Sequence, residues 1–284
     1  MEINNMVLIA DGGSTKTAWC LKMNGNVMER FTTSGVNPSV QNADNIKNVF
    51  VNELLPHICD VALVSKVYFY GAGCTPQRKG VLNDVFREIG FDNASLVIES
   101  DMLGAAKAVC GDQPGVVGIL GTGSNSCLYD GEKIIANTPS LGYILGDEGS
   151  GAVLGKLFFN AMFKGRLSEK LCQEYLDESK LEMADVIRKV YREPLANRFL
   201  ASTSLFIGKH IQDPLLSALV VDNFRSFLRN NILPYGRKDL PVNAIGSVAY
   251  YFKEQLMIAA NAEGFTVGEI LQSPMDGLLR YHSR

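Results

Sequence analysis

The feature that most constrains the fold is a glycine-rich loop that occurs twice, each time between an apolar run and a hairpin pattern. The first copy reads IADGGSTKTAWCLKMNG and the second, about a hundred residues later, reads ILGTGSNSCLYDG. Each copy ends in an Asn-Gly or Asp-Gly turn, which is the strongest short-range signal for a β-hairpin. The two copies share few residues, but their common order of parts predicts two domains of the same architecture.

The first loop contains the residue types of a phosphate-binding P-loop but lacks the spacing and the following helix of one. A P-loop needs the pattern G-x-x-x-x-G-K-[ST] and a helix directly after it. Here a single residue separates Gly13 from Thr15, and Lys16 falls within a strand pattern. We therefore interpret the loop as a hairpin turn whose backbone amides bind phosphate, with Lys16 as an ordinary strand residue.

Two such turns, one in each half of the chain, can hold the phosphate chain of a nucleotide between them. Glycine allows a close approach because it has no Cβ atom, and hydroxyl side chains add further donors. The predicted phosphate-binding residues are Gly12, Gly13, Ser14, Thr15, Gly121, Thr122, Gly123 and Ser124. Asp11 ends the strand before the first loop, where its carboxylate can hold Mg²⁺ directly or through water. A pair of purely structural hairpins is the alternative.

Strand and helix patterns alternate along the rest of the chain. Strands are predicted at 66–71, 96–99, 242–245 and 266–271, and helices at 42–55, 77–89, 102–109, 152–163 and 248–260. This alternation predicts an α/β fold. Glycine and proline cluster at 111–115, which divides the chain into a first domain of residues 1–112 and a second of residues 113–284. The second domain carries a helical insertion after its hairpin.

Three further segments place polar residues beside predicted strands or helices. Asp101 follows a strand and begins a helix, where a carboxylate can cap the helix, act as a base toward an attacking hydroxyl, or do both. Asp147, in GDEGSG, can bind sugar hydroxyls, and Glu148 can do the same or cap the helix that follows. Gly246-Ser247 suits close packing of a flat base or ribose at a helix N-terminus.

Composition narrows the function classes. The net charge of -3 gives no basic face for nucleic acid, and no apolar run reaches the length of a membrane span. The first residues lack the basic region and cleavage site of a signal peptide, so we expect a cytoplasmic protein. The six cysteines are far apart and histidine is scarce, so no metal cluster is visible and the cysteines read as small buried residues.

The full order of motifs is DGGSTKT, GVNP, SDMLGA, GTGSNS, GDEGSG and IGSVA. This order resembles the BadF/BadG/BcrA/BcrD ATPase family over nearly the whole chain, and within that family the N-acetylglucosamine kinase branch. The resemblance implies an actin-like ATPase fold, with two ribonuclease-H-like domains and ATP in the cleft between them. It implies Mg²⁺- and ATP-dependent phosphorylation of the 6-hydroxyl of an amino sugar, most directly N-acetylglucosamine, and it is compatible with a homodimer.

The resemblance also implies roles for individual residues. Thr15 and Thr122 serve the two phosphate loops, and Asp101 is the catalytic base. The residues that hold or line the sugar are Asn37, Asp101, Ser140, Leu141, Gly142, Asp147 and Gly151. The residues that flank the adenosine are Gly208, Gly246 and Ser247.

Two alternatives stay open at this point. The same family contains ATPases that activate benzoyl-CoA reductase or 2-hydroxyacyl-CoA dehydratase and carry an iron–sulfur cluster between two subunits. Cys110, beside the domain boundary, is the cysteine nearest to a suitable place, but no second cysteine pairs with it convincingly. Glucosamine or another amino sugar is the second alternative, because a motif order does not define the shape of an N-acetyl pocket.

Overall fold

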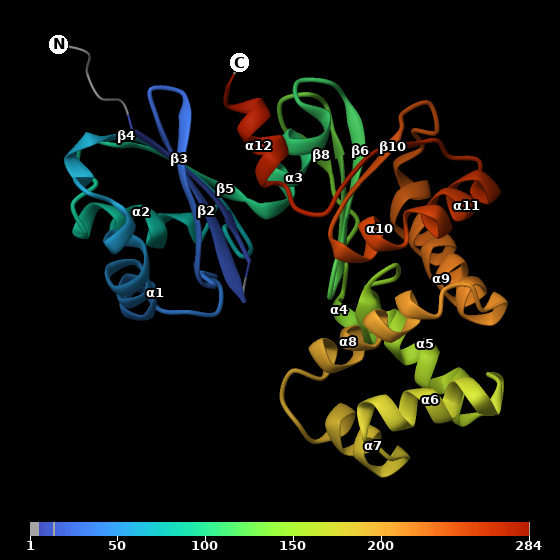
Figure 1. Ribbon diagram of the computed structural model, residues 1–284. Coiled ribbons are helices and arrows are strands. Elements are labelled where there is room, and N and C mark those ends of the chain that lie inside the picture. The colour runs from blue at the N-terminus through green and yellow to red at the C-terminus, as the bar shows by residue number, and fades with distance from the viewer. Residues whose placement is uncertain (1–5, 14, 284) are drawn as a thin grey trace. The chain divides into compact units, whose positions relative to one another are not determined.

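The computed structural model describes residues 6–13 and 15–283, which form two compact units (Figure 1). The first unit comprises Met1–Gly111 and Pro274–Arg284, and the second comprises Asp112–Ser273. The division near Gly111 falls where glycine and proline cluster in the sequence. The last eleven residues differ from the expected division, because they belong to the first unit rather than the second.

The first unit is built on a five-stranded sheet with the order β3-β2-β1-β4-β5. Its strands are β1 (Met6–Gly12), β2 (Lys16–Met23), β3 (Asn26–Ser34), β4 (Val64–Gly71) and β5 (Ser95–Ser100). The first three strands are antiparallel, and β4 and β5 run parallel to β1. Asn24 and Gly25 join β2 to β3 with φ values of 50° and 83°, as a type I′ turn requires, so the hairpin prediction is confirmed.

The second unit repeats this sheet strand for strand. Its strands are β6 (Gly115–Leu120), β7 (Ser124–Tyr129), β8 (Ile134–Ala136), β9 (Val242–Ile245) and β10 (Val267–Leu271). The order β8-β7-β6-β9-β10 matches that of the first sheet, with β6, β7 and β8 antiparallel and β9 and β10 parallel to β6. The architectural repeat predicted from the two glycine loops is therefore confirmed, and each loop joins the central strand of its sheet to the next strand.

Helices and an aromatic cluster cover one face of the first sheet. The helical segments before β5 are α1 (Ala43–Val49), the π-helical η1 (Phe50–Leu54), the 3₁₀ turns η2 (Leu55–His57) and η3 (Val61–Leu63), and α2 (Lys79–Glu88). Trp19 and Phe69 of the sheet pack against Phe50 and Phe86 of these helices. The expected helix at 42–55 thus widens into a π-helical turn and ends in a 3₁₀ turn at Pro56, because proline supplies no backbone donor.

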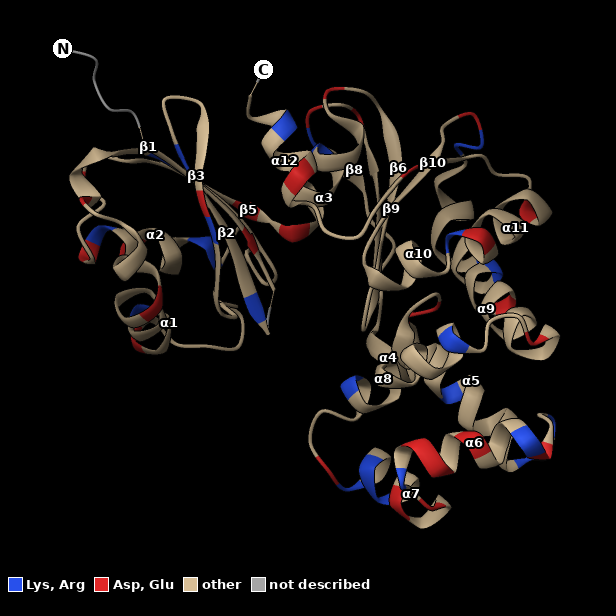
Figure 2. Ribbon diagram, viewed as in Figure 1, with Lys and Arg blue, Asp and Glu red and all other residues tan. Residues whose placement is uncertain are grey.

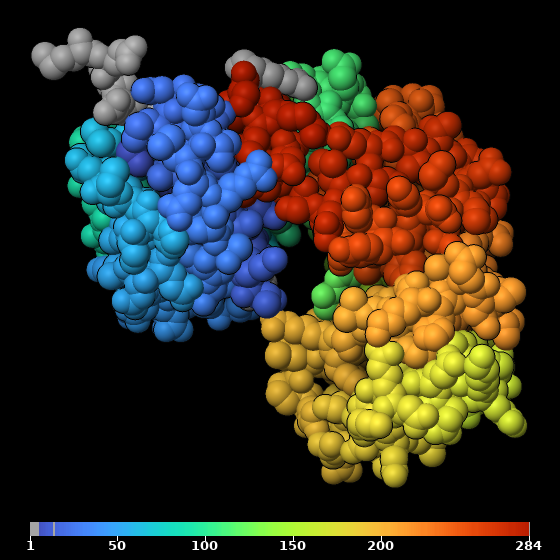
Figure 3. Space-filling model, in the orientation of Figure 1, coloured from blue at the N-terminus to red at the C-terminus, as the bar shows by residue number. Residues whose placement is uncertain are grey.

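Helix α3 (Asp101–Cys110) and the C-terminal helix α12 (Met275–Tyr281) also belong to the first unit. A Cβ atom on Gly277 would lie 2.3 Å from the Ala108 carbonyl oxygen, so α12 packs directly on α3. An ion pair of 2.8 Å joins Arg30 of β3 to Asp276 of α12. The C-terminal residues, drawn in red, accordingly lie against the blue N-terminal strands in Figure 3. These contacts explain why the segment leaves the second unit.

The second unit carries most of the helices. They are α4 (Gly142–Leu145), α5 (Gly151–Phe163), α6 (Glu169–Ser179), α7 (Met183–Tyr191), α8 (Ala196–Lys209), α9 (Pro214–Phe227), η4 (Leu228–Ile232), η5 (Leu233–Tyr235), α10 (Ser247–Tyr251) and α11 (Lys253–Glu263). The expected helix at 248–260 is interrupted at Phe252, which separates α10 from α11. Gly155 would place a Cβ atom 2.2 Å from the Leu200 carbonyl oxygen, so α5 and α8 cross in direct contact.

Charge is dispersed over the helices of the second unit. Acidic and basic residues are interspersed along α6 and α7, as Figure 2 shows, and several form ion pairs, including Arg188 with Asp185 at 3.0 Å. This mixture agrees with the absence of a basic stripe in the sequence. Within residues 6–13 and 15–283, no helix is long and apolar enough to cross a membrane.

Candidate functional site

The first glycine loop is a tight turn between β1 and β2. The Gly13 amide donates to the Lys16 carbonyl at 3.0 Å, and β2 begins at Lys16. A Cβ atom on Gly12 would lie 2.8 Å from the Phe69 ring, so only glycine fits where β1 passes β4. Thr15 is exposed, and Ser14 lies outside the described residues. The hairpin interpretation is confirmed, since no helix follows the loop, and Lys16 is a strand residue as expected.

Two predicted carboxylates lie in the first unit, on neighbouring elements. Asp11 is near the end of β1, and Asp101 is the first residue of α3, directly after β5. Ser100, not Asp101, caps this helix, because its hydroxyl accepts a hydrogen bond from the Leu103 amide at 3.2 Å. The Asp101 carboxylate instead accepts from the Met102 amide at 2.9 Å. The helix-cap alternative for Asp101 is thus wrong, and its carboxylate is available for another role.

The electrostatics of this pair are unusual. Burial raises the pKa of the Asp101 carboxyl, although the Met102 amide works in the opposite direction. Burial and the negative charge of Asp101 together raise the pKa of Asp11 to about 7, against the positive charge of Lys16. None of the described residues donates a hydrogen bond to the Asp11 carboxylate. Two carboxylates that repel each other in a partly dehydrated place form a natural binding site for a cation.

The second glycine loop joins β6 to β7 and rests on the start of α5. Within the loop, the Gly121 amide donates to the Gly123 carbonyl at 3.0 Å. The first amides of α5, those of Gly151 and Ala152, donate to the carbonyls of Gly121 and Thr122 at 2.8 and 3.1 Å. The helix therefore fixes the loop from one side.

The hydroxyl groups of this loop differ in environment. Thr122 is exposed, as a residue that meets a ligand should be. The Ser124 hydroxyl is buried and forms no hydrogen bond with any described residue. A buried hydroxyl without a partner is costly in a protein, so Ser124 is a position where a ligand or a water molecule would complete the bonding.

Asp147 lies against this second loop. Its carboxylate accepts a hydrogen bond from the Ser124 amide, and a Cβ atom on Gly123 would lie 3.0 Å from Oδ2 of Asp147. Burial raises the pKa of Asp147, while the Ser124 amide lowers it. The residue is 8% exposed and has a φ of 57°, in the left-handed region. The structure thus brings the predicted sugar residue Asp147 together with the predicted phosphate residues Gly123 and Ser124.

The other residues predicted for this part of the sugar site flank Asp147. The Ser140 carbonyl accepts from the Asp147 amide at 2.9 Å. Leu141 and Gly142 are exposed and have φ values of 60° and 73°, so the chain turns sharply before Asp147. Gly151 is buried, and a Cβ atom there would lie 3.1 Å from Ala201 of α8. The close packing of α5 on α8 therefore explains the glycine at position 151, as contact with a ligand would also do.

Glu148 does not cap α5, the helix that follows it. Ser150 caps α5 by accepting from the Val153 amide at 3.1 Å. The Glu148 carboxylate accepts instead from the side-chain amides of Asn230 and Asn231, at 2.9 and 3.3 Å. The helix-capping role considered for Glu148 is therefore wrong.

The residues predicted to flank adenosine lie on neighbouring elements of the second unit. Gly246, with a φ of 124°, precedes α10, and a Cβ atom there would lie 2.2 Å from the Leu120 carbonyl oxygen. Ser247 is the first residue of α10. Gly208, on α8, faces Phe252 at the end of α10, and a Cβ atom on Gly208 would lie 3.8 Å from the Phe252 ring. Only glycine fits position 246, because its backbone meets β6 at the second glycine loop.

Asn37 belongs to the first unit. Its side-chain oxygen accepts from the Ser39 backbone amide at 2.9 Å, and its backbone amide donates to Gln41 Oε1 at 2.7 Å. Gly73, with a φ of 76°, would place a Cβ atom 1.9 Å from that oxygen, so Asn37 packs on the loop after β4. The predicted sugar residues are thus shared between the two units, and a nucleotide cleft between those units stays a prediction.

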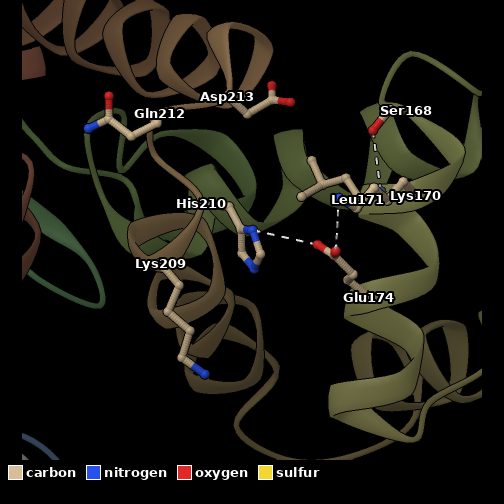
Figure 4. A pocket seen from close by; sticks show the side chains of 8 residues that line it. All are labelled: Ser168, Lys170, Leu171, Glu174, Lys209, His210, Gln212 and Asp213. Carbon is tan, nitrogen blue, oxygen red and sulfur yellow. Dashed lines mark hydrogen bonds and ion pairs between the residues drawn. The ribbon is translucent and has the colours of Figure 1, made fainter.

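A cavity of about 290 Å³ lies elsewhere, in the helical insertion among α6, α8 and the start of α9 (Figure 4). It is lined by Ser168, Lys170, Leu171, Glu174, Lys209, His210, Gln212 and Asp213. Its polar lining includes His210, whose Nδ1 lies 3.7 Å from Glu174 Oε2. None of the residues predicted for the nucleotide or the sugar lines it, so the candidate site rests on the glycine loops and carboxylates instead.

Two buried asparagines that were not predicted from the sequence contact residues 147–150, the Asp147 loop. Asn223 of α9 and Asn231 of η4 are 1% and 3% exposed, and both bond to residues 148–150. They belong to no motif. The available signal is their position, because each follows the helical spacing of the apolar residues around it, where an unpaired amide would be costly.

The duplicated sheet, with a glycine hairpin at its centre in each unit, defines a two-domain protein of the actin-like ATPase fold. No family model matches the chain. A Porphyromonas gingivalis protein, provisionally assigned as an N-acetylglucosamine kinase, is 48% identical over 98% of this chain and 99% of that one, with a TM-score of 0.93. A Chromobacterium violaceum protein with the same provisional assignment is 19% identical over 98% and 99% of the two chains, with a TM-score of 0.71, and supports the fold alone.

A curated relative gives a partial match. It is the N-acetylmuramic acid/N-acetylglucosamine kinase of Clostridium acetobutylicum, which is 28% identical over 151 residues. The match spans 51% of this chain and about half, 49%, of that relative. On the strength of the match to the Porphyromonas protein, the chain belongs to the family of N-acetylglucosamine kinase-like sugar kinases. The narrower BadF/BadG/BcrA/BcrD resemblance stays a prediction.

Proposed function

We propose that this protein is an ATP-dependent kinase that transfers the γ-phosphoryl group to the 6-hydroxyl of an amino sugar, N-acetylglucosamine first among them. The observation that carries the proposal is the carboxyl of Asp101, at the end of β5, with a pKa raised by burial. A base works best when its pKa is close to the working pH, and Asp101 is shifted in that direction. The family relationship supplies the class of substrate.

In this proposal Asp101 accepts the proton of the sugar hydroxyl as that hydroxyl attacks the γ-phosphorus, while the bond from that phosphorus to the β–γ bridging oxygen breaks and ADP leaves. The phosphate chain is bound by the backbone amides of the two glycine loops and by the hydroxyls of Thr15 and Thr122. Fixed amide donors suit this reaction, since phosphoryl transfer depends on positioning and on stabilising charge that spreads over the phosphate oxygens. Closure around the sugar would exclude water, which otherwise competes as the acceptor.

The first unit offers a suitable place for Mg²⁺. Asp11 has a carboxylate that no described residue binds by a hydrogen bond, and its neighbour Asp101 adds a second negative charge. Among the described residues no group of three or more His, Cys, Asp or Glu is arranged as a metal cage. That suits Mg²⁺, which is usually held by one or two carboxylates together with water and substrate phosphates. Held by Asp11, Mg²⁺ would neutralise charge on the phosphates.

The acceptor side of the proposal rests on Asp147 and Asn37. Carboxylate and amide oxygens accept hydrogen bonds from sugar hydroxyls, and Asp147 is already fixed beside the second phosphate loop. Ser140, Leu141, Gly142 and Gly151 stay predicted pocket residues. Gly208, Gly246 and Ser247 are proposed to flank the adenosine, because they lie on adjoining elements around Phe252. Cytoplasmic location and a homodimer stay predictions.

The test is ADP release over a panel of sugars with Mg²⁺ and ATP. The panel holds N-acetylglucosamine, glucosamine, N-acetylmuramic acid, N-acetylmannosamine and glucose. We expect the highest kcat/KM with N-acetylglucosamine and a product phosphorylated at the 6-position, identified by NMR. Preference for glucosamine would move the proposal to that sugar. ATP hydrolysis that no sugar stimulates would refute the kinase assignment.

A further inference from the structure

Asn223 of α9 forms hydrogen bonds to the loop that carries Asp147 through both the oxygen and the nitrogen of its side-chain amide. Its Oδ1 accepts from the Gly149 amide at 2.9 Å, and its Nδ2 donates to the Ser150 carbonyl at 3.1 Å. The side chain is 1% exposed, so both bonds are shielded from water. A carboxamide is the side-chain group that can accept and donate in this way without carrying a charge.

The π-helical turn η4 holds the same loop at a second point. Asn230 and Asn231, in this turn, donate to the two oxygens of Glu148. The carbonyl of Asn231 also accepts from the Ser126 hydroxyl at 3.4 Å and from the Thr138 hydroxyl at 2.9 Å. One turn therefore bonds to the Glu148 side of the loop and to β7, the strand that follows the second phosphate loop. Single π-helical turns of this kind are frequent at functional sites.

Asp147 needs support of this kind. Its φ of 57° is a backbone conformation that non-glycine residues rarely adopt and that persists only where surrounding structure imposes it. Gly149, with a φ of 81°, packs on the Phe227 side chain of α9 and cannot accept a Cβ atom, which would lie 2.8 Å from Phe227 Cβ. The end of α9 and the turn after it therefore form the base on which residues 147–150 rest.

We propose that Asn223 and Asn231 are positioning residues of the kinase, which set the place of the Asp147 carboxylate beside the second phosphate loop and so control affinity for the sugar. This inference rests on the proposed function, because it takes Asp147 as a sugar ligand. It assigns a role in substrate binding to residues that touch neither substrate in the proposed site. A role in fold stability alone is the competing explanation.

The experiment compares Asn223→Ala and Asn223→Asp with the unaltered enzyme, and measures KM for N-acetylglucosamine and for ATP at pH 8. Asn223→Ala removes both bonds to the loop, and Asn223→Asp keeps the acceptor but sets a negative charge against the Ser150 carbonyl. We expect the sugar KM to rise about tenfold or more in both variants, as the loss of a buried hydrogen-bond pair implies, with a much smaller change for ATP.

The Asp variant also gives a readout that depends on the charge at position 223. A protonated Asp has the shape and the bonding pattern of Asn, and burial raises its pKa. Binding of N-acetylglucosamine without nucleotide is therefore measured by calorimetry at pH 5.5 and pH 8.5. We expect the ratio of variant to unaltered dissociation constants to fall from about tenfold at pH 8.5 to within about threefold at pH 5.5, while the ratio for Asn223→Ala stays constant.

Asn243→Ala is the matched control. Asn243 is a buried asparagine of the same unit, 5% exposed, and its side chain bonds to the backbone of β10 and β6 rather than to the Asp147 loop. It is expected to lower the melting temperature while the sugar KM stays within about twofold of the unaltered enzyme. Circular dichroism confirms that each variant is folded at the assay temperature.

The outcomes separate the two proposals. If the unaltered enzyme binds and phosphorylates no sugar of the panel, the proposed function fails and the positioning role fails with it. If the unaltered enzyme binds the sugar but Asn223→Ala and Asn223→Asp bind it equally well, the positioning role alone is overturned. The same holds if Asn243→Ala raises the sugar KM as much as Asn223→Ala does, because the effect would then follow from stability.

Discussion

Replacing Asp11 with Asn should stabilise the first unit of the ligand-free protein while it disables the enzyme. The pKa of Asp11 rises from 3.8 to about 7 on folding, because the carboxyl is buried beside Asp101. Each pKa unit corresponds to about 1.4 kcal/mol, so ionising Asp11 costs the folded state up to ~4 kcal/mol. Asn has nearly the same volume and cannot ionise, and it removes this cost.

The stability difference between the Asp11→Asn variant and the unaltered protein should depend on pH in a defined direction. An acid whose folded pKa lies above its unfolded pKa destabilises the protein progressively as the pH rises between the two values. The stability advantage of the Asp11→Asn variant over the unaltered protein should therefore be about 1.6 kcal/mol at pH 5, increase to ~4 kcal/mol by pH 7 to 8, and then stay constant. These values are upper limits, since the protein relaxes around a buried charge.

The assay is guanidinium unfolding at pH 5, 6, 7 and 8 without divalent cations. Trp19 is the single tryptophan of the chain and is 1% exposed in the first unit, so its fluorescence reports the unit that contains Asp11. Asp84→Asn changes an exposed carboxylate of α2 in the same unit, and it is the control for the effect of removing a carboxylate that is not buried. Addition of Mg²⁺ and ATP at pH 8 should stabilise the unaltered protein much more than the Asp11→Asn variant.

Two results would contradict this reasoning. A stability difference that does not depend on pH would show that the Asp11 carboxyl titrates normally. A variant less stable than the unaltered protein at pH 8 would show that the carboxylate has favourable partners in the folded state. A variant with full kinase activity would leave the stability argument intact but would remove Asp11 from the proposed Mg²⁺ site.

Three further predictions concern the candidate site. Asp101→Asn should lower kcat by about 10² to 10⁴-fold with ATP affinity nearly unchanged by calorimetry, and normal turnover would exclude Asp101 as the base. Asp147→Ala should raise KM for the sugar far more than KM for ATP in steady-state assays, and a constant sugar KM would count against its role. Gly246→Ala should lower the melting temperature and raise KM for ATP, because a Cβ atom would meet the Leu120 carbonyl at a φ of 124°; a variant as stable as the parent would contradict the close approach.

Much of the site could be predicted because its chemistry is local in the chain. The Asn24-Gly25 turn, the two glycine loops and the carboxylate after β5 are each contained in fewer than ten residues, and each has a physical signature of its own. The roles of Asp101 and Glu148 at helix ends could not be assigned in the same way. Ser and Asp are equally good helix caps, so the sequence SDML allows either residue to cap, and only the fold shows that Ser100 does so.

The sequence by itself determined the α/β class, the duplicated hairpin, the boundary near Gly111 and the positions of the candidate loops. The tertiary structure decided the rest: that α12 returns to the first unit, that Asn223 and Asn231 hold the Asp147 loop, and that Asp101 helps to raise the pKa of Asp11. The reason is the range of the interactions. A turn or a cap depends on neighbours within a few residues, whereas a buried amide or a shifted pKa depends on groups that lie tens of residues away in the chain.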